Sequence, residues 1–294
     1  MSAATPVAAT AARLPAPRRR RPAIHLSEAL LRGHGALAYL FLYVPILVVV
    51  IYSFNDSKQV LEWGGFSTRW YAAAWQDPQV MGPLKTSLII AFVNAIFATT
   101  FGTLAALGIG RAPRWLRLGF DALVYTSLIV PEVVIALASL LFLNGAFGVL
   151  RQLGFQVGFG IPTIVAGHVL YNLSIVILIV RARIAGMDRT LVEASADLFA
   201  TPWRTFTGVT LPQLAPAVLA GALLSFTFSM DDVVLSTFLS GVGSTTLPMR
   251  VFSMIRFGVT PVVNAISTVM LALAVTAILA SLVLTRRRGE PVPG

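Results

Sequence analysis

Residues 86–110 read TSLIIAFVNAIFATTFGTLAALGIG, a run without a single charged side chain. A helix needs about 20 apolar residues to cross the roughly 30 Å of hydrocarbon in a bilayer. Such a segment must be helical in lipid, because an open strand edge would leave backbone N–H and C=O groups without partners. This stretch therefore predicts a transmembrane helix and indicates a helical membrane protein.

Five further runs resemble it in length and composition. The predicted spans are Gly35–Phe54, Thr86–Gly110, Phe120–Leu143, Pro162–Val180, Leu214–Leu239 and Val262–Leu284. The 294 residues are 56% hydrophobic and only 12% charged, and the mean hydropathy of +0.81 excludes an ordinary soluble domain. We therefore expect an all-α membrane protein with six transmembrane helices.

The formal net charge of +10 is concentrated near the two ends. Arg18–Arg21 and Arg286–Arg288 flank apolar segments, where anionic lipid is a more natural partner than nucleic acid. With the N-terminus inside, 16 of the 22 Lys and Arg residues fall on the cytoplasmic side, so the positive-inside rule predicts that both termini are cytoplasmic. We expect a disordered basic tail at 1–34, a transmembrane domain at 35–285 and a short tail at 286–294.

The loop between the fourth and fifth spans, at residues 181–212, carries two start signals for helices. Thr190-x-x-Glu193 matches a capping box, in which the threonine side chain satisfies the third helical N–H and the glutamate reaches back. This signal predicts a first helix at 191–198.

A second start signal follows at once. Thr201-Pro202 offers an N-cap residue with proline at the first helical position, where its missing N–H costs nothing. We expect a second helix from Pro202 towards Val209, a turn at Phe199 and Ala200, and an end to the unit at Leu211-Pro212. Two short helices protruding from the membrane would form a lever able to pass movement to a partner.

The same stretch, EASADLFATPWRTFTGVTLP at 193–212, resembles the coupling motif of bacterial ABC importer permeases. That pattern is Glu-Ala-Ala, three residues, Gly, nine residues, Ile-x-Leu-Pro, and its spacing is preserved here. The resemblance implies a set of residues that couple to an ATPase. They are Glu193, Ala194, Ser195, Asp197, Phe199, Ala200, Leu211 and Pro212.

Two positions of the motif differ from the family pattern. Ser195 replaces the second alanine, which is a mild change. Phe199 stands where the family has glycine, and a bulky residue with positive φ costs on the order of 1 kcal/mol or more. Either the turn is built differently here, or Phe199 acts as a plug in a groove of the ATPase.

The C-terminal half is similar to the second permease subunit of spermidine/putrescine-type importers, and the overall resemblance covers about residues 35–285. It rests on FTFSMDDVVLSTFLSGVGSTTLPMRVFSMIRFGVTPVVNAISTV at 226–269, SLIVPEVVIALASL at 127–140 and GFSTRWY at 65–71. It implies a second permease, two cytoplasmic ABC ATPase subunits, an external substrate-binding protein and transport by alternating access. ATP and Mg would be bound by the ATPase, because this chain lacks a Gly-x-x-x-x-Gly-Lys-Ser/Thr phosphate loop and needs no cofactor of its own.

Three acidic residues in the predicted spans need a physical reason, because each costs about 2.5–3.5 kcal/mol on insertion scales. Glu132 is expected near the midplane of span three, and Asp231 and Asp232 roughly 12 Å deep in span five. An acidic lining without basic partners suits a cationic substrate such as a diamine or polyamine. The alternative is that these carboxylates bond to backbone at helix breaks or pair with a partner subunit. Adjacent helical positions differ by about 100°, so only one of the two aspartates is expected to face the pathway.

Other polar residues in the spans carry less information. His168 is expected to be a core histidine bonded to a neighbouring helix rather than a metal ligand, and no catalytic site is predicted. The chain has no cysteine, which excludes disulfides and thiolate sites.

An ABC permease for another small solute is one alternative, because related permeases carry other solutes. Two rival classes are an ion-coupled secondary transporter, which needs paired intramembrane charges, and an intramembrane enzyme. The enzyme needs a Ser/Lys, Asp/Asp or His/Glu constellation at matching depths, and the depths expected for Asp231 and Glu132 differ.

Overall fold

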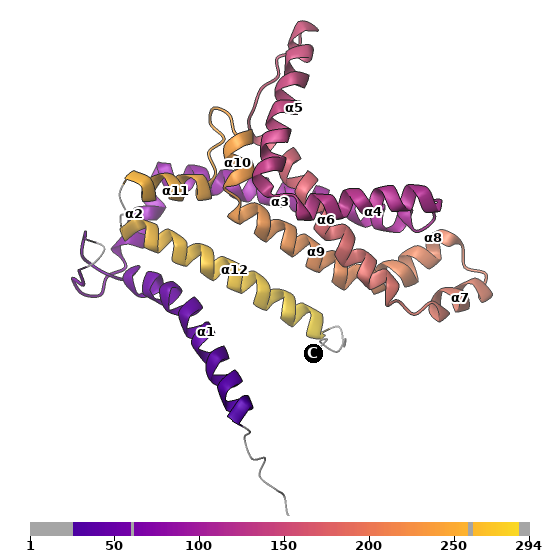
Figure 1. Ribbon diagram of the computed structural model, residues 1–294, viewed down its shortest axis with the longest axis horizontal. Helices are drawn as coiled ribbons and strands as arrows, with labels where there is room; N and C mark the ends of the chain where they lie inside the picture. The colour runs from indigo at the N-terminus through magenta and orange to yellow at the C-terminus, as the bar shows by residue number, and fades with distance from the viewer. Residues whose placement is uncertain (1–25, 60–61, 258–260, 288–294) are drawn as a thin grey trace, which may run out of the picture. The chain divides into compact units, whose positions relative to one another are not determined.

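The computed structural model describes residues 26–59, 62–257 and 261–287, and these residues are predominantly helical (Figure 1). Among them, the β-pairing is one isolated antiparallel bridge between Asn55 and Phe66. The helices are α1 Leu26–Tyr52, α2 Arg69–Gln76, α3 Pro78–Ile109, α4 Arg114–Ile129, α5 Glu132–Gln152, α6 Ile161–Ala185, α7 Thr190–Asp197, α8 Pro202–Thr205, the π-helix η1 Phe206–Thr210, α9 Leu211–Asp231, α10 Val234–Leu239, α11 Leu247–Phe257 and α12 Pro261–Arg287.

The chain divides into two compact units, residues 1–48 and residues 49–294. The described part of the first unit belongs to α1, which is strongly apolar over Leu30–Tyr52. Because α1 begins at Leu26, the end of the expected disordered tail, at 26–34, is helical instead. The remaining tail residues, 1–25 and 288–294, lie outside the described residues.

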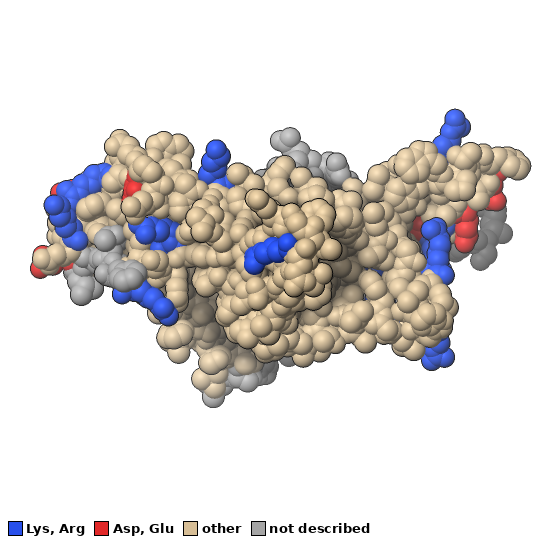
Figure 2. All heavy atoms as spheres, turned by 90° about the horizontal axis from the view of Figure 1, so that it is seen from above, with Lys and Arg blue, Asp and Glu red and all other residues tan. Residues whose placement is uncertain are grey.

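Within residues 26–59, 62–257 and 261–287, five helical stretches are long and apolar enough to cross a membrane. They are Leu30–Tyr52, Pro78–Ile109, Glu132–Gln152, Ile161–Ala185 and Pro202–Asp231. A sixth apolar stretch, at Pro261–Thr276, lies in α12 and is shorter. Most of the face drawn in Figure 2 is uncharged, which is the surface that lipid tails and apolar neighbours require.

The third predicted span is wrong as a single helix. The range Phe120–Leu143 contains the end of α4 and the start of α5, with a break at Val130 and Pro131. Pro131 has no N–H to continue the helix of α4, and the residue before a proline is pushed towards extended backbone. Val130 accordingly has φ −66° and ψ 130°. The break places Glu132 in the first turn of α5.

The fifth predicted span is also interrupted. The range Leu214–Leu239 is helical only to Asp231, and Asp232 has extended backbone with φ −69° and ψ 128°. The short helix α10 follows. It packs against α5 and α6 through a buried apolar cluster that includes Ala136, Ile164 and Leu235.

The core of the larger unit is formed by α3, α6 and α9, which pack against one another (Figure 1). Small residues allow the close approach that is typical of membrane helices. A Cβ at Gly102 of α3 would lie only 2.7 Å from Cγ1 of Val176 on α6. The buried Asn94 of α3 donates from Nδ2 to the carbonyl oxygen of Ser225 on α9 at 2.9 Å. This core holds the middle of α6 and the end of α9, which carry the polar residues described next.

Candidate functional site

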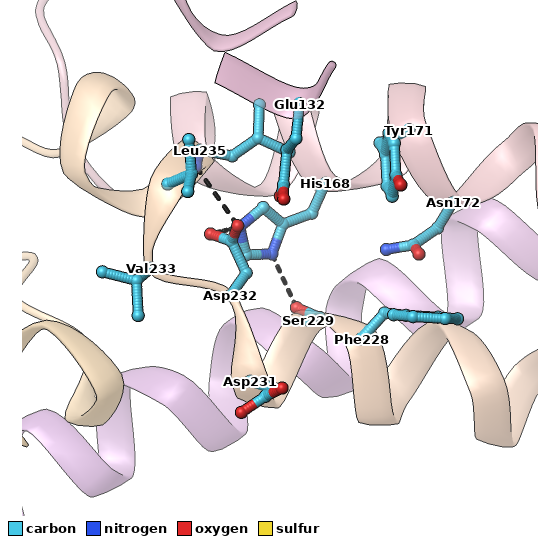
Figure 3. A pocket seen from close by; sticks show the side chains of 11 residues that line it. Glu132, His168, Tyr171, Asn172, Phe228, Ser229, Asp231, Asp232, Val233 and Leu235 are labelled. Carbon is cyan, nitrogen blue, oxygen red and sulfur yellow. Dashed lines mark hydrogen bonds and ion pairs between the residues drawn. The ribbon is translucent and has the colours of Figure 1, made fainter. Parts of the chain in front are cut away.

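A polar cavity of about 390 Å³ lies where α9 ends and α5 begins, beside the middle of α6 (Figure 3). All three acidic residues predicted for the pathway line it. Its polar lining residues are Glu132, His168, Tyr171, Asn172, Ser229, Asp231 and Asp232. The breaks at Pro131 and Asp232 therefore bring these side chains together, and the hydropathy pattern did not predict either break.

His168 is a core histidine, as expected from the sequence. Its side chain is only 1% exposed, and both ring nitrogens have partners. Nδ1 lies 2.7 Å from Oγ of Ser229, and Nε2 lies 2.9 Å from Oδ2 of Asp232 and 3.3 Å from Oγ of Ser236. The imidazole thus ties α6 to the end of α9 and to the start of α10.

Asp232 serves the helix break itself. Its Oδ1 accepts from the N–H of Leu235 at 3.2 Å, and its Oδ2 accepts from the N–H of Ser236 at 2.7 Å. These are unpaired N–H groups of the first turn of α10, which a capping carboxylate satisfies. Of the two readings that the sequence left open for Asp232, the structure shows backbone bonding at a break.

Asp231 and Glu132 are placed differently from Asp232. Asp231 is exposed and points away from His168, whereas Glu132 is half-buried and faces the cavity from above Asp232 (Figure 3). The depths expected for the three carboxylates assumed unbroken helices, and the breaks at Pro131 and Asp232 contradict that assumption. In the described part of the chain, no ion pair engages Asp231 or Glu132.

A fourth acidic residue escaped the sequence reasoning. Asp121 falls inside the predicted span Phe120–Leu143 and forms a half-buried ion pair with Arg181 at the end of α6. A full count of the acidic residues in that span would have found it. The pair links α4 to α6 at the first residue of the 181–212 segment.

A second, mainly apolar cavity of about 550 Å³ lies between α9, α11 and α12. Its apolar walls include Phe226, Met230 and Phe252. Asp231 also lines this cavity, so its carboxylate borders both the polar and the apolar space.

The 181–212 segment contains the two short helices expected there, but the first begins differently. The predicted capping box at Thr190 and Glu193 is wrong, because Thr190 is already the first residue of α7. Asp188 performs the capping instead, and its Oδ1 accepts from the Thr190 hydroxyl at 2.7 Å and from the Thr190 N–H at 2.9 Å. These two bonds hold the pKa of the Asp188 carboxyl below its usual range.

The second helix begins as predicted. Thr201 is the N-cap of α8, its hydroxyl accepts from the N–H of Arg204 at 3.4 Å, and proline follows it. The predicted end at Leu211-Pro212 is wrong, because α8 continues through η1 into α9 as one helical stretch over Pro202–Asp231. Pro212 lies two residues after the π-helical turn η1, and a π-helical turn is a local departure from the regular α-helical bonding that proline cannot complete. The second short helix is thus continuous with a candidate span.

The turn between α7 and α8 has the left-handed backbone that glycine usually adopts, but the residue there is phenylalanine. Phe199 has φ +55° and is the one non-glycine residue with positive φ in the described ranges. Its side chain is 96% exposed. Ser195, the other departure from the family pattern, bonds from Oγ to Oγ1 of Thr205 at 2.8 Å and so ties α7 to α8. A differently built turn is therefore excluded, and a protruding aromatic ring remains.

The exposed surface of the 181–212 segment combines large apolar side chains with acidic ones. Leu198, Phe199 and Trp203 are 81%, 96% and 71% exposed. The predicted coupling residues Glu193, Ala194 and Asp197 are exposed beside them, as are Leu211 and Pro212, while Ala200 is half-buried. Exposed large apolar side chains grouped in this way mark an interaction surface.

Strain at Phe199 leads to a first prediction. The left-handed conformation costs roughly 1–2 kcal/mol in a residue with a Cβ, and the exposed ring recovers none of it by packing within the chain. We expect Phe199→Gly to stabilise the turn by about 1 kcal/mol and to slow amide hydrogen exchange in α7 roughly fivefold.

The matched control is Leu198→Gly, one residue earlier. Leu198 is similarly exposed but has φ −84°, where glycine adds only freedom to the unfolded chain. Exchange in α7 should become faster in this variant. Equal changes of the same sign in both variants would contradict the strain at Phe199.

Comparison with known proteins places the chain among transporter subunits. Residues 98–289 match the family model described as binding-protein-dependent transport system inner membrane component. The chain is 42% identical over 236 residues to the putrescine transport system permease protein PotI of Escherichia coli (strain K12), covering 80% of this chain and 83% of that protein. It is 34% identical over 258 residues to the spermidine/putrescine transport system permease protein PotC of the same strain, covering 87% and 94%.

A solved structure shares the fold. A chain in the crystal structure of a bacterial ABC transporter involved in the import of the acidic polysaccharide alginate matches with a TM-score of 0.74. The match covers 90% of this chain and 96% of that chain at 17% sequence identity. At that identity the likeness shows the helical architecture alone.

Proposed function

The chain belongs to the family of binding-protein-dependent transport system inner membrane components, and we propose that it is the permease subunit of an ATP-driven importer of polyamines such as putrescine or spermidine. The observation that carries this proposal is the similarity to two polyamine permeases over most of both chains. The chain is a transport subunit in a multi-pass inner-membrane protein rather than an enzyme, and the ATPase is a separate subunit.

The membrane arrangement is part of the proposal. Five stretches meet the length and apolarity of a span, and α12, with 27 residues, is about 40 Å long and completes a set of six. The distribution of Lys and Arg favours cytoplasmic termini and puts the 181–212 segment on the cytoplasmic side. We infer that this segment couples to the ATPase.

The partners follow from the family. An importer of this kind includes a partner permease, ATPase subunits and a substrate-binding protein, and we propose one second permease, two ATPases and one external binding protein here. ATP binding would draw the ATPases together and move α7 and α8 with them. Because α8 runs unbroken into α9, that movement would reach Asp231 and the cavity.

The substrate pathway is proposed to pass the carboxylates of Glu132 and Asp231, since both face a cavity and neither is held in an ion pair among the described residues. An ammonium group leaving water needs such charges to offset its desolvation. We expect Glu132→Gln and Asp231→Asn each to lower putrescine uptake at least tenfold, measured with labelled substrate in cells that lack other putrescine importers.

The control is Glu62→Gln, which removes the same charge from an exposed loop. Uptake should be unchanged in that variant, and the amount of assembled complex should be the same in all three. Normal uptake by both pathway variants would remove the carboxylates from the pathway.

The rival class is an ion-coupled secondary transporter. It predicts transport by this chain without an ATPase. Copurification separates the two, because a tagged importer permease should bring an ATPase subunit with it, whereas a secondary transporter should not.

A further inference from the structure

The connection between α3 and α4 carries a cluster of arginines within residues 111–117. Arg111 lies in the short loop after α3, and Arg114 and Arg117 lie in the first turn of α4. All three residues are exposed. In the described part of the chain, no ion pair or hydrogen bond engages the guanidinium groups of Arg111 and Arg114. Two free cations therefore lie three residues apart in this loop.

The neighbouring polar groups do not neutralise these two charges. Arg117 donates from Nη2 to the carbonyl oxygens of Gly110 at 2.8 Å and Ala112 at 3.3 Å, and so ties the end of α3 to the start of α4. Asp121, the nearest acidic residue along the chain, is paired with Arg181. The loop between α3 and α4 therefore keeps an uncompensated positive charge.

The end of α3 places that charge at the surface of a bilayer. α3 is a candidate span of 32 residues and is therefore about 48 Å long, which exceeds the roughly 30 Å of hydrocarbon. A helix longer than the hydrocarbon extends at its ends into the headgroup region. Residues 110–117 directly follow the end of α3 at Ile109, so their arginines lie at the depth of lipid phosphate groups.

The helix α4 has the composition of a helix at this boundary. Arg114, Arg117 and Asp121 share one face, because seven residues are nearly two helical turns. The remaining surface exposes Trp115 and Leu123 at 74% and 70%. Tryptophan and arginine favour the membrane interface, since each has an apolar body and a polar end. The first turns of α4 thus present a charged end and an apolar side to the same lipid.

We propose that Arg111 and Arg114 bind the headgroup of an anionic phospholipid, with Trp115 against its acyl chain. Charge complementarity selects this ligand, because arginine donates parallel N–H bonds to phosphate oxygens and an anionic headgroup balances the excess charge. An acidic protein surface is the other occupant that two free arginines could hold. The apolar side chains that continue along α4 from the charged end match a lipid, whose acyl chains continue from its phosphate.

The lipid site is independent of the transported substrate and rests only on the proposed membrane arrangement. Arg181, the first residue of the 181–212 segment, pairs with Asp121 of α4. The arginine loop therefore lies on the same side of the membrane as that segment, which is the inner leaflet in the proposed orientation. A bound lipid would hold the start of α4 there and, through Asp121, the end of α6.

The test measures lipid contact through the fluorescence of Trp115 in the assembled transporter, reconstituted in phosphatidylcholine vesicles. A small fraction of the lipid carries bromine on its acyl chain, which quenches a tryptophan in contact, and this fraction is either phosphatidylglycerol or phosphatidylcholine. The Trp115 signal is the emission that Trp115→Phe removes. We expect brominated phosphatidylglycerol to quench this signal about fivefold more effectively, which is the preference that one basic side chain near an anionic surface supplies. Arg111→Gln combined with Arg114→Gln should abolish the preference.

The matched control is Arg189→Gln combined with Arg204→Gln, which removes the same charge from exposed positions of the 181–212 segment and should keep the preference. Equal quenching by the two lipids in the wild type would overturn the site. Loss of the preference in both double variants would also overturn it, because a general effect of charge would then be the cause. So would a Trp115 that neither lipid quenches, since a protein subunit would then cover this face. Both leaflets contain the brominated lipid, so the result is independent of orientation and of putrescine uptake, whose absence would contradict the proposed function alone.

Discussion

Replacing Asp232 with alanine is expected to lower the free energy of unfolding by about 3 kcal/mol, because a buried donor left without its acceptor costs about 1–3 kcal/mol. The side chains of Asp232 and His168 are 6% and 1% exposed, so little water is available to replace the lost carboxylate. The change also leaves the N–H groups of Leu235 and Ser236 without their acceptor. The thermal unfolding midpoint of the purified complex measures the effect.

The neighbouring carboxylate supplies the control. Asp231 is exposed and makes no ion pair in the part of the chain that the structure describes, so Asp231→Ala should change the unfolding free energy by less than about 1 kcal/mol. His168→Leu combined with Asp232→Ala should cost less than the sum of the two single changes, because they remove the same interaction. Additive losses, or equal losses at 231 and 232, would contradict the role given to Asp232.

The second large effect is expected at the proposed ATPase surface. Glu193→Lys reverses a charge on the exposed face of α7 without touching an internal bond of the segment. A like-charge contact at an interface costs several kcal/mol, so ATP-driven uptake should fall about 100-fold while the ATPase subunits still hydrolyse ATP. Uptake and ATP hydrolysis are measured together in reconstituted vesicles.

Glu62→Lys is the matched charge reversal, because Glu62 is exposed in a loop far along the chain from α7. Uptake should be unaffected by it. If Glu193→Lys transported normally, α7 would not be the coupling element.

The sequence alone was enough for features that depend on local chemistry. Hydropathy correctly predicted the apolar helices, and the Thr201-Pro202 pair correctly predicted the start of α8. The family spacing located the turn at Phe199, although only the structure showed that phenylalanine adopts the left-handed backbone. The predicted capping box at Thr190 is not formed, because the carboxylate of Asp188, two residues earlier, accepts hydrogen bonds from Thr190 instead.

The breaks that build the cavity were harder to predict. The break at Pro131 has a local cause, but the apolar residues around it read as one continuous span. The break at Asp232 has no proline or glycine beside it and depends on His168, which is 64 residues away in the chain. Acidic residues could therefore be selected as candidates from the sequence, whereas their different roles required the fold.

The central claim is that this chain forms the membrane pathway of an ATP-driven polyamine importer. The most direct measurement is uptake of labelled putrescine into vesicles that contain this chain with its partner permease and ATPase, supplied with loaded binding protein outside and ATP inside. We predict uptake that requires both ATP hydrolysis and the binding protein, and that an ion gradient cannot replace. Uptake driven by an ion gradient without ATP would contradict the claim.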